Sequence, residues 1–599
     1  MRWARTGRSD VLRVAACGLL GMTTLVAVAC GDDRRAFPAS NDVFGADAST
    51  QDAPPCGLQC SLDGRSIVQT CTGEIVETCP PDLACGAALC QEPCAAAAAD
   101  RSSNGCEFYV QSPRLSKNIP QSCHAAFIVN TSTKPVDVSL ELEGKSLDVS
   151  NAMFRMKPED ASWEKHAGAV APGESVVLFI SDRDPNVQRV PMDYADYAAC
   201  PAGVVPVVQA DINPLNTGIG SSFHLKTSAP VSAATMYPFG GAESYVSTAT
   251  LLLPVATWSK EHIIVNAWGA TAADFGLPGA QIVASDDDTE VTIIPTRDVQ
   301  GGIGVVGTPA RVPATYKLGK GQYLQFLQYE ELSGSFIYSN KPTTVFGGND
   351  CGFIPSDRGA CDFLNQQLPS FEQWGNEYAG VGYRPRLGNE HEHVFYRIVA
   401  ARDGTRLDYD PVVPPGAPLE LSAGQVVTFH SGAGDAFVVR TQDSEHPIYL
   451  AALMSGCEGK PSYGGRGDPE FVNVVPTGQY LNSYTFYADP TYGDTSLVIV
   501  RAKHGGAFKD VWLECAGNVT GFRPIGARGE YEFARVDLSR DGEAGDTFGD
   551  RTCRTGVNRM KSEGPFTATI WGWDYAVSYA YPGGMAQRKL VDTPLVPVH

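Results

Sequence analysis

The sequence predicts an all-β protein made of tandem β-sandwich-like units. The first observation behind this prediction is a motif in which a hydroxyl residue stands three positions before a proline. It occurs at Thr227-x-x-Pro230, Ser339-x-x-Pro342, Ser444-x-x-Pro447 and Ser562-x-x-Pro565. The four prolines are about 110 residues apart, and self-similarity at a fixed period is typical of a chain built from similar structural units.

The second observation is a signature that follows three of these four motifs. It reads Pro254-x3-Trp258-x3-His262, Pro369-x4-Trp374-x3-Tyr378 and Pro476-x3-Tyr480-x3-Tyr484. Because the signature recurs at the same place in each unit, we expect its aromatic side chains to pack at the junctions between units. A face on which a ligand stacks is the alternative interpretation.

The third observation is a shared opening hairpin. Four apolar runs, each followed by a turn, read as the first strands of strand–turn–strand hairpins: Phe127–Asn130, Gln281–Ala284, Arg397–Ala400 and Leu497–Val500. Units of about 110 residues suit sandwiches better than propeller blades of about 45 residues, and a β-propeller is the alternative. The units are expected at residues 106–245, 246–350, 351–456 and 457–599.

The N-terminal residues 1–29 read as a signal peptide. Four arginines precede an apolar run from Val14 to Ala29, and small residues lead up to Cys30. This ending resembles the lipobox of bacterial lipoproteins and predicts lipidation of Cys30 after cleavage; an ordinary secretory signal is the alternative. We therefore expect a protein anchored in a membrane through Cys30, outside the cytoplasm, at the outer membrane or the cell surface. Residues 30–54 are polar and read as a disordered tether.

Cysteine usage predicts disulfide bonds in an oxidising compartment. Residues 55–94 hold seven cysteines and are too few for an apolar core, so we expect a disulfide-held module there, with residues 95–105 as a linker. Zinc binding is the less favoured interpretation of this cysteine spacing. Cys457 is the candidate for an odd free thiol. The disulfide candidates are Cys56, Cys60, Cys71, Cys79, Cys85, Cys90, Cys94, Cys106, Cys123, Cys200, Cys351, Cys361, Cys515 and Cys553.

The net charge argues against nucleic-acid binding. The chain has 67 acidic and 46 basic residues, a net charge of −21. The signal peptide carries four Arg and one Asp, so its removal leaves −24 (−21 minus 3). Nucleic acids and anionic membrane surfaces both require basic patches.

Three short motifs are candidate sites. His391-Glu392-His393 would place two imidazoles on one face of a strand, as zinc requires, but no third ligand is visible and a polar loop is favoured. Asp286-Asp287-Asp288 offers oxygen ligands for calcium, but a solvated hairpin turn is favoured. Arg466-Gly467-Asp468 is the tripeptide that integrins read, in a glycine-rich stretch expected to be exposed. No catalytic or cofactor-binding motif is present.

Several stretches together resemble one known family. They include Ser228-Ala-Pro-Val231, Leu251-Leu-Leu-Pro254, Lys341-Pro342-x-x-Val345-Phe346-Gly347-Gly348 and Gln367-Leu368-Pro369. These motifs and their order along the chain resemble the N-terminal domain of IgGFc-binding proteins, and the resemblance is best between about residues 220 and 500. The lipobox and the cysteine-rich module resemble surface lipoproteins of myxobacteria. The resemblance implies a binding role and identifies no binding residue.

Taken together, these observations predict a surface-anchored module that binds an extracellular protein or glycan in adhesion. The first alternative is a structural envelope protein without a specific ligand. The least favoured alternative is a hydrolase, because nothing pairs carboxylates or histidines at catalytic spacing. We therefore expect no enzymatic activity, no cofactor and no nucleic-acid partner.

Overall fold

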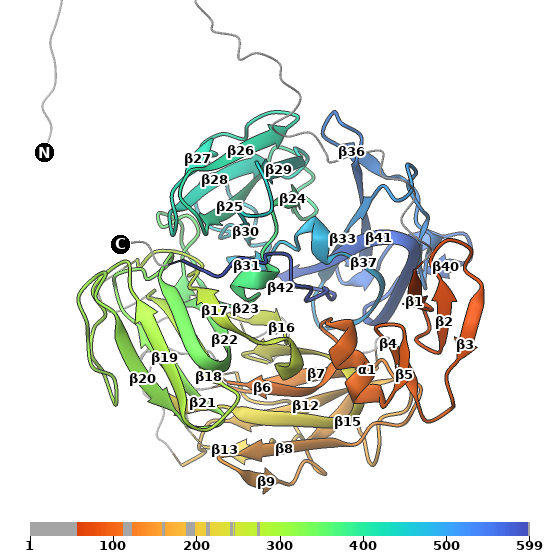
Figure 1. Ribbon diagram of the computed structural model, residues 1–599, viewed down its shortest axis with the longest axis horizontal. Helices are drawn as coiled ribbons and strands as arrows, with labels where there is room; N and C mark the ends of the chain where they lie inside the picture. Colours follow the sequence, from red (N-terminus) through yellow and green to blue (C-terminus); the bar gives the residue numbers. More distant parts are fainter. Residues whose placement is uncertain are drawn as a thin grey trace, which may run out of the picture. The chain divides into compact units, whose positions relative to one another are not determined.

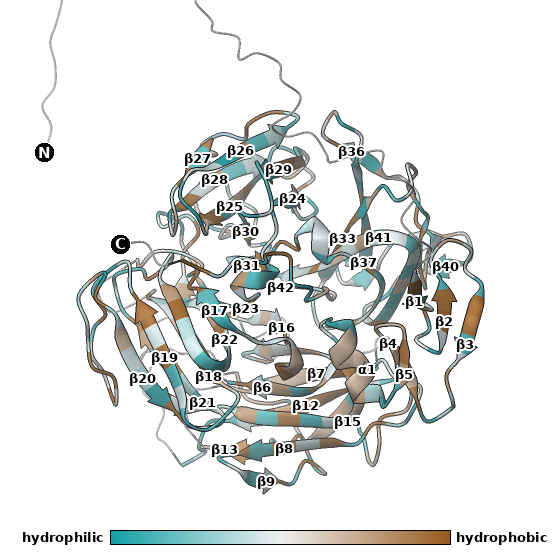
Figure 2. Cartoon of the chain, viewed as in Figure 1, coloured by the Kyte–Doolittle hydropathy of each residue, from teal (hydrophilic) through white to brown (hydrophobic). Residues whose placement is uncertain are grey.

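The structure is a computed structural model that describes residues 57–111, 122–157, 162–186, 198–210, 216–239, 244, 246–271 and 276–596. These residues form an all-β fold of several sheets, as the sequence predicts, and no propeller is indicated (Figure 1). Hydrophobic and hydrophilic positions alternate along many of the strands (Figure 2), which is the pattern of strands with one face in a core. No helix among the described residues is long and apolar enough to cross a membrane.

The N-terminal module consists of two small sheets and one helix held by disulfide bonds. Cys60 is bonded to Cys85, Cys79 to Cys90 and Cys94 to Cys106. Cys71 is also disulfide-bonded, whereas Cys56 lies outside the described residues. Its elements are β1 (Leu58–Cys60), β2 (Ser66–Gln69), β3 (Ile75–Thr78), β4 (Ala84–Gly86), β5 (Leu89–Gln91) and α1 (Pro93–Asp100).

Helix α1 corrects the expected linker at residues 95–105. The helix begins at Pro93, buries Ala96 and Ala97, and contacts both β4 of its own module and β15 (Phe223–Tyr237) of the first unit. A proline in the first helical turn followed by an alanine run favours a helix. The low polarity of the alanines is therefore explained by packing and not by a flexible connection.

The first unit is a ten-stranded sheet. The disulfide bond between Cys123 and Cys200, a pair that the sequence suggests, lies in this unit. Its strands are β6 (Gly105–Val110), β7 (His124–Asn130), β8 (Val138–Leu142), β9 (Lys145–Leu147), β10 (Met153–Met156), β11 (Trp163–Lys165), β12 (Ser175–Asp182), β13 (Val208–Gln209), β15 (Phe223–Tyr237) and β16 (Thr248–Leu251).

The second unit is an eight-stranded sheet, and it includes β14 from the preceding stretch of sequence. A disulfide bond joins Cys351 to Cys361. Its strands are β14 (Gly218–Ser221), β17 (Ser259–Ile263), β18 (Pro278–Ala284), β19 (Thr289–Ile294), β20 (Ala314–Leu318), β21 (Gln322–Leu327), β22 (Phe336–Gly352) and β23 (Asp362–Leu368).

The third unit consists of two four-stranded sheets that enclose a shared hydrophobic core, which is the arrangement of a β-sandwich. The first sheet contains β24 (Glu377–Gly380), β26 (Thr405–Asp410), β27 (Glu420–Leu421) and β29 (Phe437–Thr441). The second contains β25 (His393–Ala400), β28 (Val426–Gly432), β30 (Ile448–Met454) and β31 (Glu470–Asn473).

The fourth unit is a nine-stranded sheet with a small hairpin, and Cys515 is bonded to Cys553 in it. Its strands are β32 (Leu481–Ala488), β33 (Asp494–Ala502), β34 (Val511–Leu513), β35 (Gly517–Asn518), β36 (Arg523–Ile525), β37 (Tyr531–Arg540), β38 (Glu543–Ala544), β39 (Thr547–Phe548), β40 (Arg551–Thr552), β41 (Gly556–Asp574) and β42 (Val577–Pro582).

The hydroxyl-x-x-Pro motif marks the bend of a long strand. In β22, the residues before Pro342 pair with β19, and those after it pair with β18 and β23. Strands β15 and β41 divide their partners in the same way around Pro230 and Pro565. In the third unit the long strand is broken at the motif, into β29 and β30. Proline lacks an N–H group for the ladder, so a strand that contains it bends and changes partners there.

The aromatic signature (Pro254–His262, Pro369–Tyr378 and Pro476–Tyr484) forms a joint between units, and this joint contacts the bend of the long strand. Each copy opens with a short 3₁₀ helix: η2 (Val255–Thr257), η3 (Phe371–Gln373) and η4 (Thr477–Gln479). The Tyr378 hydroxyl then donates a hydrogen bond to the carbonyl of Ile448 at 2.6 Å, and the Tyr484 hydroxyl donates to Phe566. His262 lies 3.1 Å from the Thr343 hydroxyl. Each partner residue directly follows the motif proline of its unit, so the two signatures meet in space.

Four inner strands bring the units together. Strand β16 contacts β23 and β42, and β31 contacts the same two strands, so the contacts form a cycle (Figure 1). Each inner strand pairs with the long strand, or its broken equivalent, that precedes it in the chain. The expected boundaries at 246, 351 and 457 therefore assign β16, β23 and β31 to the unit after the one whose sheet each joins, whereas β42 stays in its own unit.

Candidate functional site

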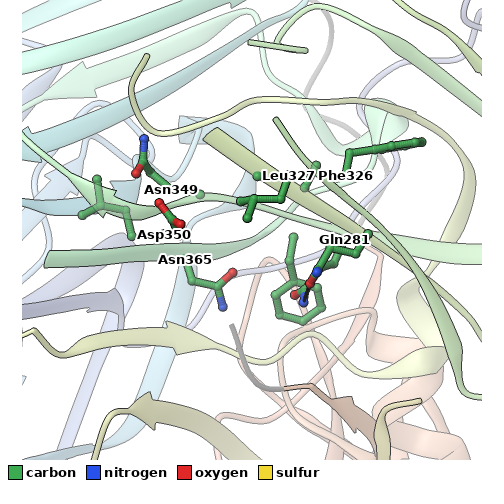
Figure 3. Close-up of a pocket in the computed structure, with 12 residues that line it drawn as sticks. Gln281, Phe326, Leu327, Asn349, Asp350 and Asn365 are labelled. Carbon is green, nitrogen blue, oxygen red and sulfur yellow. Dashed lines mark hydrogen bonds between the residues drawn. The ribbon is translucent and has the colours of Figure 1, made fainter. Parts of the chain in front are cut away.

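A pocket on the sheet of the second unit is the candidate functional site. Its cavity volume is about 20 Å³, which holds about one water molecule and is far below the range for small-ligand sites; the pocket is partly open to solvent. Strands β18, β21, β22 and β23 all contribute to its lining (Figure 3). The site therefore depends on strands that are up to about 90 residues apart in the sequence.

Two glycines on neighbouring strands help to form the pocket. Gly279 of β18 lies opposite Gly348 of β22, and Asn365 of β23 follows on the other side of Gly348. A Cβ atom on Gly348 would lie 1.7 Å from the carbonyl oxygen of Leu364, so this position admits no side chain. A Cβ on Gly279 would meet Leu327 at 3.0 Å. The absence of side chains here keeps the backbones close and the sheet surface hollow.

Most polar groups in the lining are held by the protein itself. The Gln281 amide donates to Gln325 at 2.8 Å, and the Gln325 amide donates to the carbonyl of Asn216 at 2.6 Å. The Asn349 amide donates to two backbone carbonyls, and the Asp350 carboxylate accepts a hydrogen bond from the Leu277 N–H. These bonds fix the orientation of the pocket wall, as a preorganised binding site requires.

Asn365 is the exception in this lining. Its side-chain amide forms no hydrogen bond with any described residue, and solvent reaches the amide atoms although the residue as a whole is only 7% exposed. Figure 3 shows the amide directed toward the side of the pocket where Gln281 lies. An amide that faces solvent in a pocket bonds to water, and a ligand group that donates to it and accepts from it can take the place of that water.

A second polar group lies among the inner strands. We call Asp362, Asp468 and Glu470 the inner carboxyl cluster; all three are buried. Burial, together with the negative charge of the other two members, raises the pKa of Asp362 well above its usual value. Burial is the main cause that raises the pKa of Glu470 well above its usual value. Burial also raises the pKa of Asp468 to about 8.

The inner carboxyl cluster joins the sheets of all four units. Glu470 accepts hydrogen bonds from the Thr248 hydroxyl of β16 and from the Ala580 N–H of β42, both at 3.1 Å. Asp362 accepts one from the Ser578 N–H at 3.3 Å. Because these carboxyl groups are enclosed, a dissolved substrate cannot reach them, and we interpret the cluster as structural.

The three short candidate motifs do not lie together in one site. His391 is exposed, Glu392 is buried in an ion pair with Arg386, and His393 stacks on His430 with ring centroids 4.2 Å apart. Across the described residues, no group of three His, Cys, Asp or Glu side chains is arranged to hold a metal ion. Asp287 accepts a hydrogen bond from the Lys320 N–H at 2.9 Å, as expected for a carboxylate in a turn.

The expectation that Arg466-Gly467-Asp468 is exposed is wrong for its acidic residue. Asp468 is 1% exposed and accepts a hydrogen bond from the Cys457 N–H. Arg466 forms ion pairs with Asp494 and Asp541. A receptor that reads this tripeptide needs a free carboxylate, which the buried Asp468 does not offer.

The recurring aromatic side chains are buried in the joints and not in the pocket. Trp374 and Tyr378 are fully buried, and the Trp374 indole donates to the carbonyl of Pro369 at 3.1 Å. Cys457 is the free cysteine among the described residues and is buried. The predicted lipidation site, Cys30, lies outside the described residues.

The pocket residues had no signal in the sequence beyond their type. Gln281 is an amide inside a strand that otherwise reads as apolar, which is uncommon, whereas Asn349 and Asn365 lie in strands that contain several other polar residues. That signal was available, but it does not indicate which strands become neighbours.

Comparison with known proteins places the chain in a family. A search of curated proteins finds no match. The family model described as IgGFc binding protein matches residues 248–572, which is more than half of the 599 residues and includes all the residues that line the pocket. This range runs from the inner strand β16 into β41 of the fourth unit. The chain therefore belongs to the IgGFc-binding protein family.

Proposed function

We propose that this protein is a surface-anchored module that binds an extracellular protein or glycan, and that the pocket of the second unit is its contact point. Membership of the IgGFc-binding protein family supports a binding role. The observation that carries the proposal is the solvent-accessible amide of Asn365, which lines the pocket and forms no hydrogen bond with any described residue. Nothing in this proposal requires catalysis or a cofactor.

The chemistry of the lining favours a neutral ligand rich in hydrogen-bonding groups. The Asn365 amide offers both a donor and an acceptor, and Phe346 and Leu327 add apolar surface. The cavity has room for about one water molecule, so a ligand would place only a single small group, such as a hydroxyl, inside it. A sugar on a glycoprotein satisfies both conditions, because its hydroxyls donate and accept while its ring faces are apolar.

Anchoring through Cys30 would hold the binding module at the envelope. The proposed tether of residues 30–54 separates the lipid from the first described residue, Gly57. Labelling cells with a palmitate analogue tests the anchor, with the Cys30→Ala variant as the control. We expect label on the unaltered protein alone; equal labelling of both would contradict lipidation at this residue.

The binding proposal is tested with purified full chain and with immunoglobulin Fc as the first probe, since the family is named for it. Fc with its N-linked glycan, Fc stripped of the glycan, and a glycan array separate a glycan from a protein ligand. We expect saturable binding to at least one probe. No saturable binding to any of them would favour the structural envelope alternative.

The role of the pocket is tested with Asn365→Leu, which keeps the side-chain size and removes the amide. We expect this variant to weaken binding by about 10-fold, the equivalent of losing one hydrogen bond of about 1.4 kcal/mol. Asn518→Leu is the matched control, because Asn518 is an exposed asparagine in the fourth unit. Equal binding by the two variants would contradict the assignment of the pocket.

A further inference from the structure

Strand β3 of the N-terminal module has an open edge. The sheet runs in the order β1-β2-β3, so β3 pairs with β2 on one side and with no described strand on the other. Its residues are exposed along their whole length, with Ile75 at 60% and Val76 at 52%. An edge with exposed apolar residues and unpaired backbone groups is a template for a further strand.

A bulge explains why two consecutive side chains are exposed. The register between β2 and β3 shifts between Ile67 and Val68, so Val68 lies opposite Ile75 and Ile67 lies opposite Glu77. Val76 is the extra residue on β3. In a regular strand Ile75 and Val76 would point to opposite faces, and here both remain accessible.

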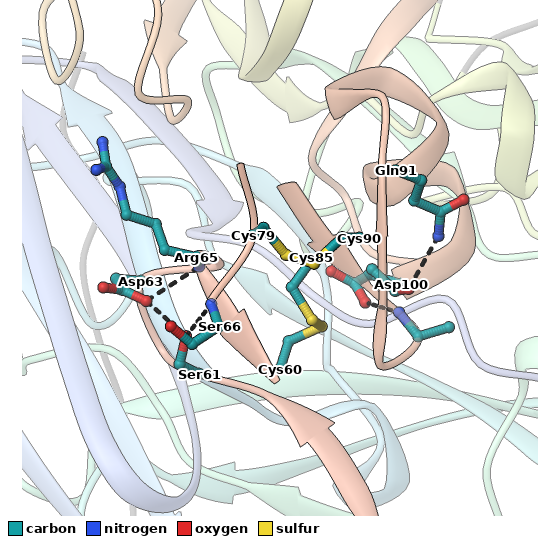
Figure 4. The surroundings of a disulfide bond; sticks show 12 residues. Cys60, Ser61, Asp63, Arg65, Ser66, Cys79, Cys85, Cys90, Gln91 and Asp100 are labelled. Atoms are coloured by element: carbon teal, nitrogen blue, oxygen red, sulfur yellow. Dashed lines mark hydrogen bonds between the residues drawn. A yellow bond between two sulfur atoms is a disulfide. The ribbon is translucent and has the colours of Figure 1, made fainter. Parts of the chain in front are cut away.

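Disulfide bonds hold this edge in place before any partner arrives. Cys79 directly follows β3 and is bonded to Cys90, and the neighbouring bond joins Cys60 to Cys85 (Figure 4). The Ser61 hydroxyl donates to the Asp63 carboxylate at 2.6 Å in the turn that leads into β2. A preformed edge pays little ordering entropy when it binds.

The negative charge of the N-terminal module favours a basic partner over a second copy of this chain. Residues 57–92 carry five acidic residues and one basic residue, and Glu74 and Glu77 flank the apolar pair on β3. If two copies of β3 paired antiparallel about the midpoint of Ile75 and Val76, Glu74 of one copy would face Glu77 of the other. Like charges directly opposite each other destabilise a strand pair, so a second copy of this chain is disfavoured.

We propose that β3 is a docking edge for an extended, basic and apolar segment of a partner protein, which adds a strand to the module. The partner's backbone pairs with the open edge, its apolar side chains cover Ile75 and Val76, and its basic side chains face the two glutamates. This interaction is separate from the pocket of the second unit, so each can fail without the other.

The probe is a fluorescent eight-residue peptide of alternating lysine and valine, titrated into full-length protein and followed by anisotropy. A second peptide of the same sequence carries N-methyl groups on alternate backbone amides, which keeps its charge and apolarity but blocks strand pairing. We expect the methylated peptide to bind at least 10-fold more weakly. We expect Glu74→Lys/Glu77→Lys to weaken binding of the unmodified peptide by at least 10-fold.

A matched pair of variants tests the apolar contact. Ile75→Ser/Val76→Ser is expected to weaken binding at least fivefold, whereas Val412→Ser/Val413→Ser changes an exposed valine pair in a loop and is expected to leave it unchanged. Mass spectrometry of the disulfide bonds verifies that each variant is folded. The proposal is overturned if the unmodified peptide does not bind, if the methylated peptide binds equally well, or if both serine variants behave alike.

Discussion

The joint between the second and third units offers the sharpest test of how the units are held. The Tyr378 hydroxyl accepts a hydrogen bond from the Gly375 N–H at 3.1 Å and donates one to the carbonyl of Ile448 at 2.6 Å. Tyr378→Phe removes this hydroxyl and nothing else. Because the site is buried, both backbone groups lose their partner without gaining water. Each unsatisfied buried group is unfavourable by about 1–3 kcal/mol, so we expect the two groups together to lower the free energy of unfolding by about 2–6 kcal/mol.

The assay is urea unfolding combined with hydrogen exchange of the peptide that contains Gly375. We expect Tyr378→Phe to lower the first unfolding midpoint and to speed exchange at the joint. Tyr484→Phe, at the equivalent place in the fourth unit, should behave in the same way. Tyr329→Phe changes an exposed tyrosine and should have no effect. A midpoint for Tyr378→Phe equal to that for Tyr329→Phe would refute the importance of the joint.

Three further predictions follow from buried groups. Burial raises the pKa of Asp468 to about 8, above the value of about 4 in an unfolded chain, so its contribution to stability is present below pH 4 and is lost as the pH rises toward 8. The urea unfolding midpoint should therefore decrease from pH 5 to 7 to 9, and it should decrease less for Asp468→Asn. A midpoint that increases with pH would contradict this prediction. Gly375→Ala would place a Cβ 2.4 Å from Pro476, so thermal unfolding should show a loss of about 1–3 kcal/mol, whereas Gly269→Ala has open space and should match the unaltered protein. Burial raises the pKa of the Cys457 thiol to about 11, so a thiol reagent at pH 8 should label Cys457 only after unfolding, and rapid labelling of the native protein would show that the thiol is accessible.

Local patterns predicted the strands and the repeat but not where each sheet ends. The four hydroxyl-x-x-Pro motifs could be recognised in the sequence. Their physical role as strand bends became clear only from the pairing, in which β22 changes partners around Pro342. The boundary at residue 351 was misplaced by one strand, because β23 follows a turn and a cysteine pair yet returns to β22. A boundary drawn from turn signals cannot detect such a return.

Sequence patterns could not predict the pocket of the second unit, for a related reason. Asn365 and Gln281 are 84 positions apart and meet only because β18 and β23 both pair with β22. Asp468 shows the opposite error, since its glycine-rich surroundings favoured an exposed loop. The structure places it instead beside the inner strands, where Cys457 and Ser578 hold it by hydrogen bonds. Local composition does not report long-range burial.

Binding through the pocket of the second unit is the central claim, and titration of glycosylated Fc and a glycan array with the full chain tests it most directly. The account predicts saturable binding to at least one probe and a loss of about 10-fold in affinity for Asn365→Leu, with Asn518→Leu unchanged. Binding that is the same for the unaltered protein and Asn365→Leu, or no saturable binding to any probe, would contradict it.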